Sequence, residues 1–247
     1  MITAHFYPDP SHGLGSIDGG VRRVLANRTW SQIRDGAGNQ SDETRLTESM
    51  VISCHTTSDK YDAIHRIILT FNTVSIPIGA IIVDAKLRLY VVSWMVDTPF
   101  ANAPKVAVFE SYPNDVDYLV DADYGHIYDT VLSNEVKFVD LPINNHVILI
   151  LNAIGLTKVT PAGVTKLALR ESYWDAGNIQ PPWKAHDNWS VIFRMRDSNP
   201  LSQRPRLTID YYDPSYKRSA LPSAREGTAA RLQSSARILS PVRIIDP

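Results

Sequence analysis

Alternation of apolar and polar residues is the strongest pattern along this chain. In residues 83–92, the odd positions from Ala85 to Val91 are apolar and the positions between them are mostly polar. A period of two is typical of a β-strand with one buried face. Segments that are alternating, or rich in β-branched and aromatic residues, predict the strongest strands at 64–72, 83–92, 105–109, 146–151, 189–196 and 206–212.

Weaker patterns add further strands and two short helical segments. Residues 146–151 (HVILIL) are apolar apart from His146, so we expect this strand to be fully buried. Pro77-Ile78-Gly79 marks a turn, which predicts that 64–72 and 83–92 are neighbouring antiparallel strands. Further strands are expected at 2–7, 28–34, 50–55, 135–139 and 165–170, and helical turns within 115–132 and 152–160.

The number and spacing of these segments predict the fold class. About ten short strands with few helices favour an all-β sandwich or barrel over alternating β and α units. The 16 prolines and 12 glycines suit many turns, and 44% hydrophobic residues are enough for a core. We therefore expect one all-β domain over residues 1–213.

Residues 214–247 differ in composition from the rest of the chain. They contain six basic and two acidic residues and are rich in Ser, Ala, Arg and Pro. Such a segment is not expected to fold alone. Its end is apolar again, which leaves two interpretations open, a docking peptide for another chain or a frayed terminus. The candidate docking residues of this extended basic arm are Arg237, Ile238, Leu239, Val242, Ile244 and Ile245.

Charge and hydropathy exclude several classes of partner. The formal net charge of −1 gives no overall attraction to nucleic acid or to a membrane. No apolar run reaches the roughly 18–20 residues that span a bilayer, so we expect no membrane insertion. The start of the chain lacks the basic and apolar regions of a secretory signal, which predicts synthesis in the cytoplasm.

The residues that commonly carry catalysis or bind metals form no known motif. Cys54 is the one cysteine, and its apolar surroundings favour a small buried side chain. The histidines lack the spacing of a zinc protease. The acidic loop of Asp115, Asp117, Asp121 and Asp123 is interpreted as solvated, with a calcium site as the weaker alternative. We predict no catalytic residue, metal or cofactor, and no enzyme; a hydrolase would need a cleft with two carboxylates.

Aromatic residues of one loop are the candidate ligand-binding residues. Tyr173, Trp174 and Trp183 lie between two predicted strands. If exposed and coplanar, these rings would stack on sugar faces, with Asp175 among the hydrogen-bond acceptors. The alternative, to which we give more weight, is that they cover the core or contact a neighbouring subunit.

Ten segments in fixed order resemble a known family. They are FYP at 6–8, DG at 18–19, IRDGAGN at 33–39, HRIILTFNT at 65–73, IPIGA at 76–80, AKLRLY at 85–90, DLPIN at 140–144, LNAIGL at 151–156, GVTKLALR at 163–170 and RPRLTIDY at 204–211. Over residues 1–212 the chain resembles DNRLRE-type jelly-roll domains, which are related to disaggregatase-associated modules and to family 96 carbohydrate-binding modules. It is most similar to phage and environmental viral versions. The resemblance implies a two-sheet antiparallel jelly-roll sandwich.

These observations lead to a predicted function by binding and assembly. We expect a structural protein of a phage or similar particle, as a capsid decoration, fibre or tail component. Its partners would be other particle proteins or copies of itself, and it would be virion-associated. The alternative is a carbohydrate-binding module for surface glycans. Nucleic-acid contact through the basic arm ranks last, because six charges on a flexible segment bind weakly.

Overall fold

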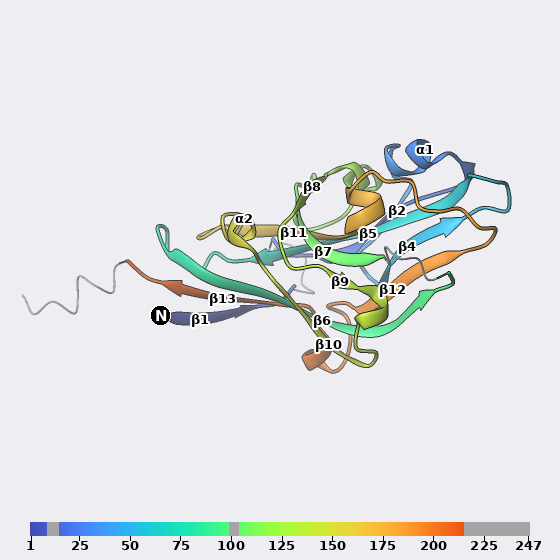
Figure 1. Cartoon of the computed structure of the whole chain (residues 1–247). Coiled ribbons are helices and arrows are strands. Elements are labelled where there is room, and N and C mark those ends of the chain that lie inside the picture. Colours follow the sequence, from blue (N-terminus) through green and yellow to red (C-terminus); the bar gives the residue numbers. More distant parts are fainter. Residues whose placement is uncertain (9–14, 99–103, 215–247) are drawn as a thin grey trace, which may run out of the picture. The chain divides into compact units, whose positions relative to one another are not determined.

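A computed structural model describes residues 1–8, 15–98 and 104–214 (Figure 1). Every strand pair in this part is antiparallel, and the helices are short, which confirms the predicted all-β antiparallel sandwich. The elements are β1 (Ile2–Phe6), β2 (Asp18–Arg28), α1 (Trp30–Arg34), β3 (Gln40–Asp42), β4 (Thr47–Cys54), β5 (Tyr61–Asn72), β6 (Ile81–Val96), β7 (Lys105–Ser111), η1 (Asp121–Gly125), β8 (Ile127–Val131), β9 (Val136–Lys137), η2 (Phe138–Asp140), β10 (Asn145–Ile150), α2 (Ala153–Leu156), β11 (Val164–Glu171), η3 (Ser172–Ala176), β12 (Asn188–Arg194), η4 (Leu201–Gln203) and β13 (Arg206–Tyr212).

The strands form two layers that are joined at one end (Figure 1). One layer contains β1, β13, β6 and β10. The other contains β2, β5, β11 and β7, with β3, β8 and β9 at its margins. β12 and β4 pair with each other and connect β6 of the first layer to β5 of the second.

The second layer is buried on both of its faces. Leu167 and Leu169 of β11 belong to a cluster that also holds Leu87 and Leu89 of β6, between the two layers. Ala168, between them in sequence, belongs to a second cluster that includes residues of α1, η1 and η3. Burial on both faces explains the apolar runs Ile67–Leu69 of β5 and Leu167–Leu169 of β11, whereas β6 alternates.

The alternating segments were predicted correctly because each buries one face only. The four apolar positions of β6 from Ala85 to Val91 are fully buried. Trp189 and Phe193 of β12 and Leu207 of β13 are buried in the same way. For these strands the period of two alone determines which side chains enter the core.

Three expectations about local structure were wrong. Residues 28–34 do not form a strand: Thr29 and Gln32 form a capping box that starts α1. β5 and β6 are not paired, because the turn at Pro77–Gly79 leads from one layer to the other. β10 is half-buried, because Val147 and Leu149 face the core, whereas Ile148 and Ile150 are 49% and 47% exposed.

Three further strands, β2, β3 and β8, were not predicted from the sequence. β2 begins with the pair Gly19-Gly20, which is usually a turn signal. In the structure these glycines allow close packing, since a Cβ on Gly19 would lie 2.4 Å from the Asp42 carbonyl oxygen of β3. The glycines therefore belong to the interior of a sheet and not to a loop.

His65 is a polar side chain enclosed by neighbouring strands. In β5 it pairs with Arg22 of β2 and with Val51 of β4. Its Nδ1 lies 3.2 Å from the Ser49 hydroxyl. Burial, together with the charges of Arg22 and Arg45, lowers the pKa of His65 to about 3. The ring is therefore neutral in the folded protein at every pH where the domain is expected to be used.

This neutral histidine should make the domain sensitive to mild acid. In the unfolded chain His65 has the ordinary pKa of 6.5 and takes up a proton that the folded state does not bind. Its contribution is therefore complete above pH 6.5 and is lost as the pH falls toward 3. Between about pH 7.5 and about pH 5, the wild type should lose about 1–2 kcal/mol more of its free energy of unfolding than His65→Gln. Urea denaturation at both pH values measures this difference, and equal losses would contradict it.

Met1–Pro214 forms one compact unit. The candidate arm residues Arg237, Ile238, Leu239, Val242, Ile244 and Ile245 lie outside the described residues. Within the part of the chain that the structure describes, none of the helices is long and apolar enough to cross a membrane.

Candidate functional site

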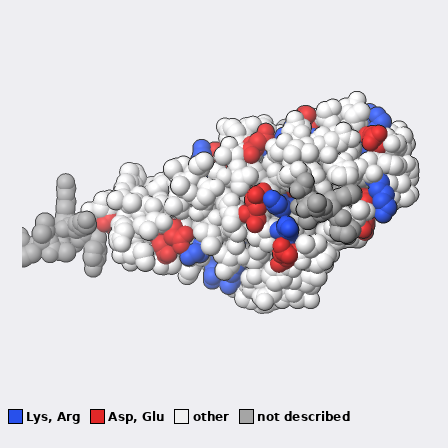
Figure 2. All heavy atoms as spheres, viewed as in Figure 1, with Lys and Arg blue, Asp and Glu red and all other residues white. Residues whose placement is uncertain are grey.

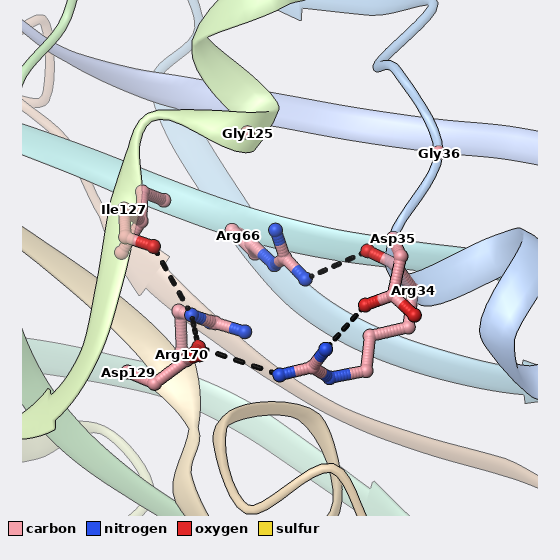
Figure 3. Close-up of a pocket in the computed structure, with 8 residues that line it drawn as sticks. All are labelled: Arg34, Asp35, Gly36, Arg66, Gly125, Ile127, Asp129 and Arg170. Carbon is pink, nitrogen blue, oxygen red and sulfur yellow. Dashed lines mark hydrogen bonds and ion pairs between the residues drawn. The ribbon is translucent and has the colours of Figure 1, made fainter.

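A cavity of about 200 Å³ lies beside the second layer, at the ends of α1 and η1 (Figure 3). α1 and the loop after it supply one wall, β5 and β11 supply the base, and β8 supplies the other wall. The lining residues are Arg34, Asp35, Gly36, Arg66, Gly125, Ile127, Asp129 and Arg170. Three arginines therefore line one small space, from elements far apart in sequence.

One buried carboxylate, that of Asp175, holds two of these arginines. Arg66 donates from Nε to Oδ2 at 2.8 Å and from Nη2 to Oδ1 at 2.6 Å. Arg170 donates to the same two oxygens, at 3.1 Å and 2.9 Å. Burial opposes the charge on Asp175, but the two guanidiniums outweigh burial and hold the pKa of Asp175 well below its usual range. We call these three residues the arginine clamp.

Backbone and aromatic contacts complete the surroundings of the arginine clamp. Arg66 Nη1 donates to the Tyr124 carbonyl oxygen at 2.7 Å, and its guanidinium lies 4.0 Å from the centre of the Tyr124 ring. Arg170 Nη1 donates to the carbonyl oxygens of Ile127 and Tyr128. Burial disfavours the charge of Arg170, but Asp175 outweighs it, so the pKa of Arg170 is raised. Both guanidiniums are therefore fixed in place as cations.

Asp175 is positioned by the short π-helix η3, which follows β11 directly. The Glu171 carboxylate accepts the backbone N–H groups of Tyr173, Trp174 and Asp175, the first and third at 2.9 Å and the second at 2.5 Å. It also accepts the N–H of Lys105 at 3.1 Å. Burial raises the pKa of Glu171 to about 7, against the effect of these four donors. Arg170 and Glu171 are adjacent in sequence, so one strand end supplies both a clamp residue and the cap that places Asp175.

The mouth of the cavity carries a third arginine and two exposed carboxylates. Arg34 Nε donates to the Asp175 carbonyl oxygen at 2.5 Å, and its Nη1 bonds Asp35. Asp129 Oδ1 accepts from Arg170 Nη1 at 2.6 Å and lies 3.4 Å from Arg34 Nη2. The Asp129 side chain is 61% exposed, and that of Asp35 is about half exposed. The mouth is therefore charged on both sides, whereas the base is made of cations.

This arrangement suits binding better than proton transfer. Guanidinium groups stay charged and do not act as acids or bases near neutral pH. Asp175 is not suited to act as a general acid, because its pKa is lowered and a general acid near neutral pH needs a raised one. Cys54 is buried as predicted, and burial raises the pKa of its thiol to about 11. In the described ranges, no cluster of three or more His, Cys, Asp or Glu side chains could hold a metal ion.

The predicted platform of Tyr173, Trp174 and Trp183 does not form. Trp174 is 1% exposed and packs against Trp189, with ring centroids 4.9 Å apart. The rings of Tyr173 and Trp174 lie at 68°, so they are not coplanar. Trp183 is partly buried and donates its Nε1–H to the His55 carbonyl oxygen at 3.0 Å. All three rings pack on the second core cluster, in agreement with the packing alternative.

The acidic loop is held by its own hydrogen bonds. Asp123 is fully buried, and its carboxylate accepts the N–H groups of Asn114 and Val120. Asp117 accepts the N–H of Gly15 at 2.9 Å, and Asp115 accepts that of Asp117. These contacts give the four-carboxylate segment a structural role in closing the loop.

The arginine clamp was not predicted, although the sequence contains one signal for it. Arg66 directly precedes the apolar run Ile67–Leu69 and Arg170 directly follows Leu167–Leu169, both in segments predicted as strands. A charged residue in such a segment needs a buried partner of opposite charge. The partner could not be identified, because Asp175 was one of many acidic residues and was interpreted as part of an exposed loop.

Comparisons with known proteins give no assignment. Neither the protein-family models nor the curated proteins include a match to this chain.

On the face shown in Figure 2, acidic and basic residues are interspersed, and neither sign forms a large continuous area among the described residues. The fold and the cavity therefore define the class of protein as an all-β sandwich with a buried arginine clamp.

Proposed function

We propose that this chain is a non-enzymatic structural protein of a phage or similar particle and that it works by assembly with copies of itself. The observation that carries this proposal is an exposed apolar area at one end of the first layer. It comprises Ile78 and the start of β6, together with the paired ends of β1 and β13. Its members are Ile2, Val74, Ile78, Ile81, Val83 and Tyr212, and we call it the apolar tip.

The apolar tip exposes large apolar side chains to water, which is unfavourable in an isolated monomer. Ile78 is 84% exposed and Ile81 is 63% exposed. Exposed apolar side chains on paired strand ends, such as those of Ile81 and Tyr212, are typical of a protein–protein contact. β1 also leaves its outer edge unpaired within the described residues, which offers backbone groups to an added strand.

The proposed occupant is the apolar end of the C-terminal segment of a neighbouring copy. Residues 215–247 follow Pro214, close in sequence to Tyr212 of the apolar tip. When extended, 33 residues reach about 100 Å, enough to reach a second subunit. The segment carries Ile238, Leu239, Val242, Ile244 and Ile245, which match the tip in chemistry.

Light scattering coupled to size-exclusion chromatography tests this assembly. We expect the full chain to form a defined oligomer, and both Ile78→Ser/Ile81→Ser and a chain ending at Pro214 to be monomers. Their Tm should stay within about 2 °C of the wild type, because the changed side chains are exposed. Leu201→Ser is the matched control, since Leu201 is 62% exposed but lies on η4. It should leave the oligomer intact.

A full chain that stays monomeric at every concentration would contradict self-assembly. The next experiment would then test the alternative function, glycan binding. This alternative is favoured by a second set of aromatic rings, distinct from Tyr173, Trp174 and Trp183. Tyr112 and Tyr128 are both exposed, with ring centroids 4.7 Å apart, and Tyr112 lies 4.9 Å from the His126 ring. The Tyr112 hydroxyl also donates to the carbonyl oxygen of Gly125, a residue that lines the cavity, so stacking and hydrogen bonding to a sugar would combine here.

A further inference from the structure

The arginines that line the cavity carry more N–H donors than the hydrogen bonds of the fold use. Arg34, Arg66 and Arg170 reach it from α1, β5 and β11, and Figure 3 shows their guanidiniums close together. Their side chains are 10%, 4% and 2% exposed. Cations in such a buried position act on a ligand more strongly than cations on an open surface.

Several donors remain for a ligand. Each terminal guanidinium nitrogen carries two N–H groups. Within the described part of the chain, Arg34 Nη1 bonds Asp35, Arg34 Nη2 bonds Asp129, and Arg66 Nη1 bonds the Tyr124 carbonyl oxygen. Each of these nitrogens has a second N–H beyond that bond. The arginines thus keep donors after the arginine clamp has formed.

The arginine clamp also prepares the site before a ligand arrives. Asp175 fixes Arg66 and Arg170 with two hydrogen bonds each, so these side chains lose little further freedom on binding. Asp175 neutralises only one of the three cations. The other two are matched at present by Asp35 and Asp129, whose side chains extend into solvent at the mouth.

We propose that this cavity binds a small oxyanion, a phosphate or a sulfate, which replaces the Asp129 carboxylate on Arg34 and Arg170. A space of about 200 Å³ equals roughly six water molecules at about 30 Å³ each, which accommodates the five heavy atoms of phosphate. Planar guanidiniums donate to phosphate oxygens in pairs. The space beside Gly125 is open, since a Cβ there would meet no atom within 4 Å.

Isothermal titration calorimetry of the full chain with inorganic phosphate, at constant ionic strength set by chloride, tests the site. Arg34→Gln should weaken binding about tenfold or more, since it removes donors to a charged group. Asp129→Asn should tighten binding several-fold, because it removes the competing carboxylate. Arg45→Gln is the control, since Arg45 is exposed and pairs with Asp42 outside the cavity, and it should bind as the wild type does. Sulfate in place of phosphate should give a similar affinity.

Three results would overturn the proposal. They are no heat of binding in the wild type, equal weakening by Arg34→Gln and Arg45→Gln, and weaker binding by Asp129→Asn. Equal weakening would indicate a general effect of charge, and weaker binding by Asp129→Asn would indicate that this carboxylate is needed by the ligand. If Arg34→Gln does not fold, the increase expected for Asp129→Asn still decides, because its exposed carboxylate is not needed for folding.

Discussion

Asp175→Asn is expected to lower the free energy of unfolding by about 3–5 kcal/mol, because it removes one partner of a buried ion-pair cluster. Two guanidiniums that are almost fully buried would then share a neutral amide. The amide NH₂ group cannot accept a hydrogen bond, so at least one pair of guanidinium N–H groups would lose its acceptor. The shape of the side chain is kept, and the change therefore reports on charge and hydrogen bonding.

Thermal and urea unfolding measure this effect. For a domain of this size, 1 kcal/mol corresponds to about 2–4 °C, so the Tm should fall by roughly 10 °C. Asp129→Asn is the control: it also bonds Arg170, but it is 61% exposed and should cost less than about 1 kcal/mol. Similar losses from the two substitutions would show that burial does not make Asp175 special.

The fold was predictable where one physical requirement decides the residue pattern. β6, β12 and β13 bury one face, so their alternation identified both the strand and its inward side chains. β10 contains the apolar run Val147–Ile150, yet alternate side chains face solvent, because only one face of the strand packs on the core. Position in a sheet is a tertiary property, and the local pattern does not contain it.

The site was less predictable because it depends on three segments that are far apart in sequence, α1, β5 and β11 with the adjoining η3. Arg34, Arg66, Arg170 and Asp175 meet only after α1, β5 and β11 have packed together. From the sequence alone, each of these arginines could pair with any of many acidic residues. The local expectation that failed nearby, a strand at 28–34, failed for a related reason, because the capping box of Thr29 and Gln32 outweighed strand propensity.

The arginine clamp and the apolar tip belong to different layers of the sandwich. The arginine clamp joins η3 to β5 and β11 on the outer side of the second layer. The apolar tip belongs to the first layer, around β1, β6 and β13. The proposed assembly at the tip and the proposed anion binding at the cavity would use different surfaces, so a substitution at one should leave the other unchanged.

Trp174→Ala is expected to destabilise the domain by about 3–5 kcal/mol, which is typical of truncating a large buried aromatic side chain. Trp174 is 1% exposed, contacts the Trp189 ring and belongs to the second core cluster. Its backbone N–H is held by Glu171, so the surrounding helix has little freedom to close over the space left behind. Urea denaturation gives the loss directly.

Trp183→Ala is the matched control, because Trp183 lies in the same predicted loop but is only partly buried. It gives up one hydrogen bond to the His55 carbonyl oxygen and part of its packing, so its cost should be about 1–2 kcal/mol. A much larger loss of free energy of unfolding for Trp174→Ala than for Trp183→Ala would show that the Trp174 ring has a packing role. If Trp174→Ala were as stable as the wild type and had lost binding to a glycan, the ring would have to be accessible, and the platform hypothesis would replace the packing role.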